Sequence, residues 1–258
     1  MIMRLSLVPP RYVAKSKQIF DKNRLRQDMK IIRLVLTLMT AFVLVVGSIG
    51  CATTSPTVQT GPDAEVTFDG LHKYDNTRVD AAWAVPHLNL SRYTKILPVN
   101  AGIEYKEVKN RGSTSVARSR GGPYFIDDKA RAQFEALVDE IVMEELQKSN
   151  RFHIVDEPGP NTLLVSGGLL NVTSQVPPDP IGSRSRIYLS SVGEATLVLE
   201  IRDSETNRIL ARAVDRRAAE SIGGSFTQSN SVTNTAEIRR LIRFWASGLR
   251  EALEGFTR

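Results

Sequence analysis

Two stretches of the chain carry apolar residues at every third or fourth position, the spacing that places them on one face of a helix. The first predicts a helix over residues 127–149, with aspartates at its start as candidate caps. The second predicts a helix over residues 235–254, opened by a capping-box-like pair, Asn234 and Glu237. Both apolar stripes need a surface to cover, so we expect the two helices to pack on one sheet.

Alternating apolar and polar positions predict strands before and between the helices. The clearest pattern runs over residues 194–202, and the polar turn that follows predicts a hairpin with the next strand. Pro98 places one strand at a sheet edge or a strand end, and the pair Gly167 and Gly168 predicts a bulge or bend in another. The six predicted strands span residues 78–85, 93–99, 152–156, 162–173, 194–202 and 208–216. We therefore expect an α+β fold, a mostly antiparallel sheet with two long helices packed on one face.

Residues 29–51 have the order of an export signal. A methionine and two cations, Lys30 and Arg33, precede an uncharged apolar run, a small-residue stretch and Cys51, the only cysteine in the chain. The apolar run covers 13 residues, whereas a helix that spans a bilayer needs about 20. We therefore expect a lipoprotein signal peptide over 29–50 and a lipid on Cys51, with an uncleaved membrane anchor as the alternative.

The signal divides the chain into four segments. Residues 1–28 are basic and show no apolar period, so we expect an extension ahead of the true start; a long cytoplasmic n-region is the alternative. Residues 51–68 begin with a Thr-, Pro- and Gly-rich stretch and predict a flexible tether. Residues 69–258 are expected to form a single periplasmic domain.

The basic composition comes mostly from the leader. Residues 1–50 hold nine Lys and Arg against two Asp and Glu, which leaves 25 cations and 26 anions in the rest of the chain. The high isoelectric point therefore does not indicate nucleic-acid binding.

The sequence contains no recognisable catalytic or metal-binding motif. His72, His87 and His153 occur singly, and no cysteine beyond Cys51 could join them as a metal ligand. Neither a GxSxG elbow nor a phosphate-binding loop is present. We therefore expect no enzymatic activity, no cofactor and no metal. A lipid-anchored hydrolase that uses His72 or His87 with a carboxylate is the competing hypothesis.

Arginines gather in two predicted loops and at the end of the predicted hairpin. If these segments converge, they form an anion-binding rim suited to lipid headgroups, lipopolysaccharide phosphates or an acidic protein. The favoured alternative is three separately solvated polar loops. The rim would consist of Arg111, Arg118, Arg120, Arg184, Arg186, Arg216 and Arg217.

Three segments of the chain resemble an uncharacterised bacterial lipoprotein family known as domain of unknown function 3313. They are residues 78–99, 152–172 and 195–220, and they contain an aspartate before a strand, a Tyr–Pro strand and an Asp–Thr hairpin turn. The resemblance implies an outer-membrane lipoprotein and supplies no active site to transfer. The order of elements is also similar to that of small periplasmic domains in envelope-assembly lipoproteins, which is an analogy of fold alone.

Together these features predict a non-enzymatic binding or assembly module on the periplasmic face of the outer membrane. Ala52 follows Cys51 where lipoproteins retained at the inner membrane tend to carry Asp, which favours outer-membrane sorting. The expected partner is an envelope protein or glycan, and the oligomeric state stays open. A small-ligand binding protein with long loops around a pocket is the further alternative, which an enclosed apolar cavity would favour.

Overall fold

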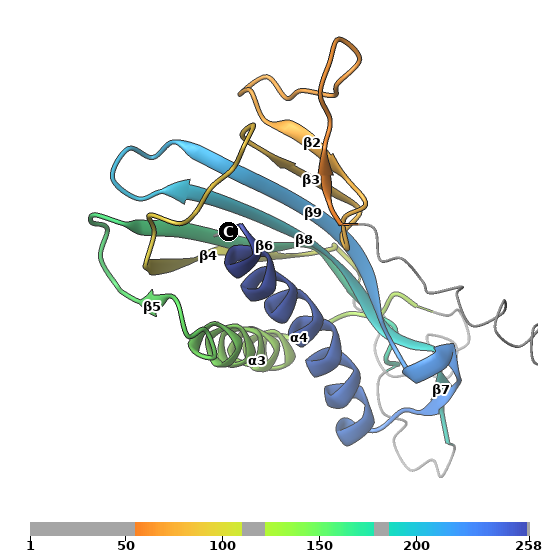
Figure 1. The fold of residues 1–258 in the computed structure, drawn as a ribbon. Coiled ribbons are helices and arrows are strands. Elements are labelled where there is room, and N and C mark those ends of the chain that lie inside the picture. The colour runs from red at the N-terminus through yellow and green to blue at the C-terminus, as the bar shows by residue number, and fades with distance from the viewer. Residues whose placement is uncertain (1–54, 110–121, 178–185, 257–258) are drawn as a thin grey trace, which may run out of the picture. The chain divides into compact units, whose positions relative to one another are not determined.

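The computed structural model describes residues 55–109, 122–177 and 186–256. These residues build one sheet in the order β1-β2-β3-β9-β8-β6-β4-β5, a small β10-β7 pair, and two helices below the sheet in Figure 1. The strands are β1 (Thr57–Val58), β2 (His72–Asp75), β3 (Ala81–Ala84), β4 (Lys95–Tyr105), β5 (His153–Ile154), β6 (Thr162–Ser174), β7 (Tyr188–Leu189), β8 (Ser191–Asp203), β9 (Ile209–Glu220) and β10 (Thr227–Gln228). The helices are α3 (Asp128–Gln147), α4 (Ser231–Gly255) and the short 3-10 turn η1 (Ile222–Gly224).

The large sheet is antiparallel except at one side. β4 pairs in parallel with β6 and, over Lys95 and Ile96 alone, with β5. All other neighbours in the sheet are antiparallel, including the long β8–β9 hairpin. The predicted α+β class, with both helices on one face, is confirmed (Figure 1). The predicted signal peptide lies outside the described residues.

Both helices form where the apolar periods predict them, and their caps explain their starts. The Asp127 side chain accepts a hydrogen bond from the Ala130 N–H at 2.8 Å and so begins α3. The predicted start of α4 is wrong by one turn. Asn230 caps it by accepting from the N–H groups of Val232 and Thr233, and the Thr233 hydroxyl accepts from the Asn230 N–H in return. This capping box satisfies the first free N–H groups earlier in the chain than Asn234 could.

Two details of the strands differ from the sequence predictions, and one agrees. Gly167 and Gly168 pair regularly with β8, and the nearby register shift lies in β4, between Asn100 and Gly102. The region expected to be a tether includes β1, which pairs with β2, so strand pairing begins at Thr57 rather than after residue 68. Pro98 does lie at an edge, since no described strand pairs with the outer side of β4 beyond Ile96.

The core between sheet and helices consists of two apolar clusters. One joins Leu146 and Leu253 of the helices to Leu163 and Val165 of β6. The other joins Ile242 and Trp245 of α4 to Ile141, Leu169, Val172 and Ala195. The two clusters meet under the crossing of α3 and α4, so the space between them is bounded by both helices.

Candidate functional site

An apolar cavity of about 250 Å³ lies where the two core clusters meet. Its floor is formed by β4, β6 and β8, and its roof by the apolar faces of α3 and α4. It is lined by Pro98, Val99, Asn100, Gly102, Ile103, Val138, Asp139, Val142, Met143, Leu146, Val165, Gly167, Gly168, Leu169, Leu197, Leu199, Ile242, Trp245, Ala246 and Leu249. A hollow of this size in the middle of the apolar layer is the strongest candidate for a binding site in the part of the chain that the structure describes.

The cavity exists because one strand position that faces the helices has no side chain. Along β6, Leu163, Val165 and Leu169 belong to the core clusters, and the alternation places Gly167 between them on the same face. A Cβ built on Gly167 would meet only Leu199 Cδ1, at an ordinary 3.7 Å. Across the sheet, Leu199 on β8 is only partly buried although strands flank it on both sides. The missing side chain therefore leaves open space.

The mouth of the cavity is polar and lies between β4 and α3. Asn100 Nδ2 donates to Asp139 Oδ1 at 3.1 Å, and Asn100 Oδ1 accepts from the Gly102 N–H at 2.8 Å. Gly102 has φ +101°, which a residue with a side chain adopts only with strain. This bulge turns the Asn100 side chain toward α3 and places one polar bridge at the entrance to an otherwise apolar space.

A buried carboxylate fixes the α4 wall. Asp215 on β9 is fully buried, and its Oδ2 accepts from Trp245 Nε1 at 2.7 Å and from Arg217 Nε at 2.6 Å. Its Oδ1 accepts from the Asp80 N–H at 3.0 Å. The network joins β9, the chain before β3, and α4, and so holds the Trp245 ring against the cavity.

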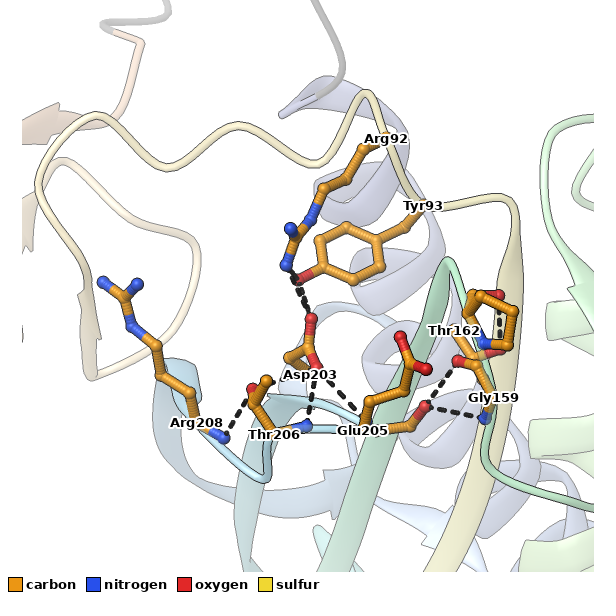
Figure 2. Close-up of polar contacts among 10 residues, drawn as sticks. Arg92, Tyr93, Gly159, Thr162, Asp203, Glu205, Thr206 and Arg208 are labelled. Carbon is orange, nitrogen blue, oxygen red and sulfur yellow. Dashed lines mark hydrogen bonds and ion pairs between the residues drawn. The ribbon is translucent and has the colours of Figure 1, made fainter.

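A second carboxylate network, shown in Figure 2, lies at the turn of the β8–β9 hairpin. Asp203 Oδ2 accepts from Tyr93 Oη at 2.8 Å and from Arg92 Nη2 at 2.6 Å. Its Oδ1 accepts from the N–H groups of Glu205 and Thr206 and from the Thr206 hydroxyl. Every oxygen of Asp203 is thus occupied, and the hairpin turn is joined to the segment that leads into β4.

The electrostatics of this network favour a structural role. Hydrogen bonds, above all from the Thr206 N–H, lower the pKa of Asp203 to about 2 despite its burial, and burial raises the pKa of Tyr93. Asp203 therefore holds a charge that neighbouring donors stabilise, whereas a general acid or base needs a pKa near the working pH. The arrangement positions backbone segments and offers no group for proton transfer.

The arginine rim is only partly within the described residues. Arg111, Arg118, Arg120 and Arg184, like Cys51, lie outside them, and Arg186 is exposed before β7. Arg216 donates to both oxygens of Glu194 at 2.9 and 3.0 Å. Arg217 donates to Asp215 and to the Arg78 carbonyl, with its guanidinium 4.2 Å from the centre of the Phe244 ring. The two arginines of β9 are therefore engaged within the fold.

The histidines are not brought together into a reactive group. His72 Nδ1 lies 3.0 Å from the Gln59 carbonyl, His87 lies in a loop with φ 56°, and His153 is exposed on β5. Within the described residues no group of three or more His, Cys, Asp or Glu side chains is arranged to hold a metal ion. No helix among them is both long and apolar enough to cross a membrane.

A family model matches residues 66–249 of the chain, and that family is described as a protein of unknown function, DUF3313. The chain belongs to the DUF3313 family. This confirms the resemblance predicted from the sequence. Comparison of this DUF3313 protein with curated proteins gives no match.

Solved structures similar to the DUF3313 chain are distant. They include a PelC dodecamer from Paraburkholderia phytofirmans, with 10% identity, coverage of 65% of this chain and 96% of that one, and a TM-score of 0.32. Protein XCC0632 of Xanthomonas campestris, from family DUF330, has 11% identity, 67% and 89% coverage and a TM-score of 0.37. The hypothetical protein CT253 of Chlamydia trachomatis has 10% identity, 62% and 99% coverage and a TM-score of 0.31. Likenesses of this size do not bear on function.

The DUF3313-like motifs of the sequence take structural places in the fold. The aspartate before a strand is Asp80, whose N–H donates to Asp215. The Tyr–Pro strand begins near Tyr93, and the Asp–Thr turn is formed by Asp203 and Thr206, which meet in Figure 2. The cavity itself was missed by sequence reasoning. Its signal was Gly167, which occupies an apolar-face position in an alternating strand.

Proposed function

We propose that this DUF3313 protein is a lipid-anchored module of the cell envelope that binds a small apolar ligand without transforming it. The observation that carries the proposal is the apolar cavity between the sheet and the two helices. It favours the ligand-binding alternative over a purely structural module, because a filled core would have served a structural role better.

The volume of the cavity limits the size of the ligand that it can hold. An engineered apolar cavity of about 150 Å³ in another protein binds benzene, and pockets for drug-sized molecules span about 300–1,000 Å³. A cavity of about 250 Å³ lies between these values. It fits one alkyl chain or one ring rather than a complete two-chain lipid.

The side chains around the cavity support the proposal that the bound ligand is not chemically changed. Asp139 and Asn100 contribute the polar groups at its mouth, and the Trp245 N–H is engaged by Asp215. Among the described residues that line the cavity there is no serine, threonine, cysteine, lysine, tyrosine or histidine, and Asp139 at the mouth has no such group beside it in the lining. Acid–base or nucleophilic catalysis needs such groups within reach of the substrate.

The proposed location of the protein in the cell envelope is based on its sequence. The signal over residues 29–50, a lipid on Cys51 and Ala52 after it support an outer-membrane lipoprotein that faces the periplasm. Mass spectrometry of the membrane-extracted protein tests this part: an acylated N-terminus at Cys51 supports it. An intact chain that starts at Met1 or Met29 would replace it with an uncleaved anchor.

Ligand binding can be tested through the fluorescence of Trp245, the tryptophan that lines the cavity. The chain has two tryptophans, Trp83 and Trp245, and Trp83 does not line the cavity. Trp83→Phe removes an indole N–H that has no partner among the described residues, so the change costs no hydrogen bond there. In a Trp83→Phe, Cys51→Ser chain free of detergent, 1-decanol should shift the Trp245 emission saturably. A linear, unsaturable response would contradict binding.

A further inference from the structure

The cavity carries a single charge, and that charge lies at its mouth. Among the described residues that line the cavity, Asp139 is the only charged one. Asn100 is its polar neighbour, and both side chains are exposed. The head of a ligand whose alkyl chain occupies the apolar interior would therefore lie beside a carboxylate.

The Asp139 carboxylate can accept further hydrogen bonds. Asp139 Oδ1 accepts from Asn100 at 3.1 Å, and no ion pair with a described residue neutralises the group. The arginines on the facing part of α4 pair instead with other acids of α3, Arg239 with Glu140 and Arg243 with Glu144. A hydroxyl or ammonium head would donate to the remaining lone pairs of Asp139, whereas a carboxylate or phosphate head would be repelled.

We infer that the cavity selects a single alkyl chain with a hydrogen-bond-donating, non-anionic head, and that Asp139 is the residue that makes this selection. The inference rests on the proposed function, since it names the class of ligand that the same cavity takes. Free fatty acids and phosphate-headed single chains are accordingly the disfavoured members of the class.

A matched series of decyl compounds tests the selection in the Trp83→Phe, Cys51→Ser chain. Decylamine should bind roughly tenfold more tightly than decanoate at low ionic strength, a difference of about 1.4 kcal/mol, because the Asp139 carboxylate attracts the ammonium head and repels the carboxylate head. Decanol should fall between them. The difference should shrink as salt is added, since the mouth is exposed to solvent.

Two variants assign the selection to one side chain. Asp139→Asn should bring the affinities for decylamine and decanoate within about twofold of each other, while decanol affinity changes less than about twofold because the Asn oxygen still accepts from the hydroxyl. Glu140→Gln is the matched control, because Glu140 is the next residue of α3 and does not line the cavity. It should leave the tenfold preference in place.

The outcomes separate this inference from the proposed function. If decanol binds but decylamine and decanoate bind equally well, or if Asp139→Asn leaves the preference unchanged, the inference is wrong and the binding function stands. If none of the three compounds binds, both the inference and the proposed function are wrong.

Discussion

Filling the cavity should stabilise the protein and abolish ligand binding at once. Gly167→Val places a β-branched side chain in the open space, and its Cβ would make one ordinary contact, 3.7 Å from Leu199 Cδ1. Glycine is a poor residue for a strand interior, and valine is a favourable one. The backbone of Gly167 pairs regularly with β8, so no special conformation opposes the change.

The size of the effect follows from the added carbon atoms. At roughly 0.8 kcal/mol per buried carbon, the three carbons of valine set an upper limit of about 2.4 kcal/mol. Removing a strand glycine adds about 0.5–1 kcal/mol, while side-chain ordering and adjustment of neighbours oppose the gain by a similar amount each. We expect the free energy of unfolding to rise by about 1–2 kcal/mol. For a domain of this length the melting temperature should rise by about 2–8 °C.

The neighbouring glycine provides the control. A Cβ on Gly168 would lie 3.0 Å from the Gly102 carbonyl oxygen and 3.3 Å from Ala101 Cβ, so Gly168→Val should destabilise the fold. Thermal and denaturant unfolding measure both variants, and the Trp245 titration measures decanol binding to Gly167→Val. If Gly167→Val destabilises the protein, the space beside Gly167 is not open enough to hold a side chain, and the reasoning is refuted. A stabilised variant that still binds decanol would show that the cavity is not the binding site.

Three further changes test the networks that hold the walls. Asp203→Asn should remove a pH dependence: because the folded-state pKa of Asp203, about 2, lies below its ordinary value, its contribution is present above about pH 4 and lost as the pH falls toward 2. We expect wild type to lose about 1–2 kcal/mol more than the variant over that range, after a discount for solvent screening, and equal losses in urea titrations would contradict this. Asp215→Ala leaves the buried Trp245 N–H without its acceptor and removes the carboxylate that joins Arg217 and the Asp80 N–H, and it should cost about 1–3 kcal/mol in guanidinium unfolding; a cost below about 0.5 kcal/mol would refute the role of the network. Asn230→Ala should cost about 1 kcal/mol and fray the first turn of α4, seen as faster amide exchange there, whereas unchanged exchange would mean that the cap is dispensable.

The sequence predicted the parts of the fold that depend on local periodicity. The apolar stripes of α3 and α4 and the alternation in β8 are visible in short windows, and all three elements form. The start of α4 was misplaced because Asn230 and Asn234 are both plausible caps, and only the hydrogen bonds of Asn230 distinguish them. The short strands β1 and β2 have too few residues to show an alternating pattern.

The candidate site was less accessible from the sequence. The volume of the cavity depends on how α3 and α4 pack on the sheet, and no short window of sequence contains that information. Only the pair Gly167 and Gly168 was visible, and it was interpreted as a bulge or bend. The partners of the β9 arginines were hidden for a similar reason, since Glu194 meets Arg216 diagonally across the hairpin once the register is known.

The most direct test of the central claim is to locate the ligand. In the methyl-labelled Cys51→Ser chain with bound decanol, nuclear Overhauser effects should connect the alkyl protons to the methyl groups of Leu197, Leu199 and Ile242, which line the cavity. Contacts found only to exposed methyl groups such as those of Val232, which is 76% exposed, would mean nonspecific surface adsorption and would contradict a binding cavity between the sheet and the two helices.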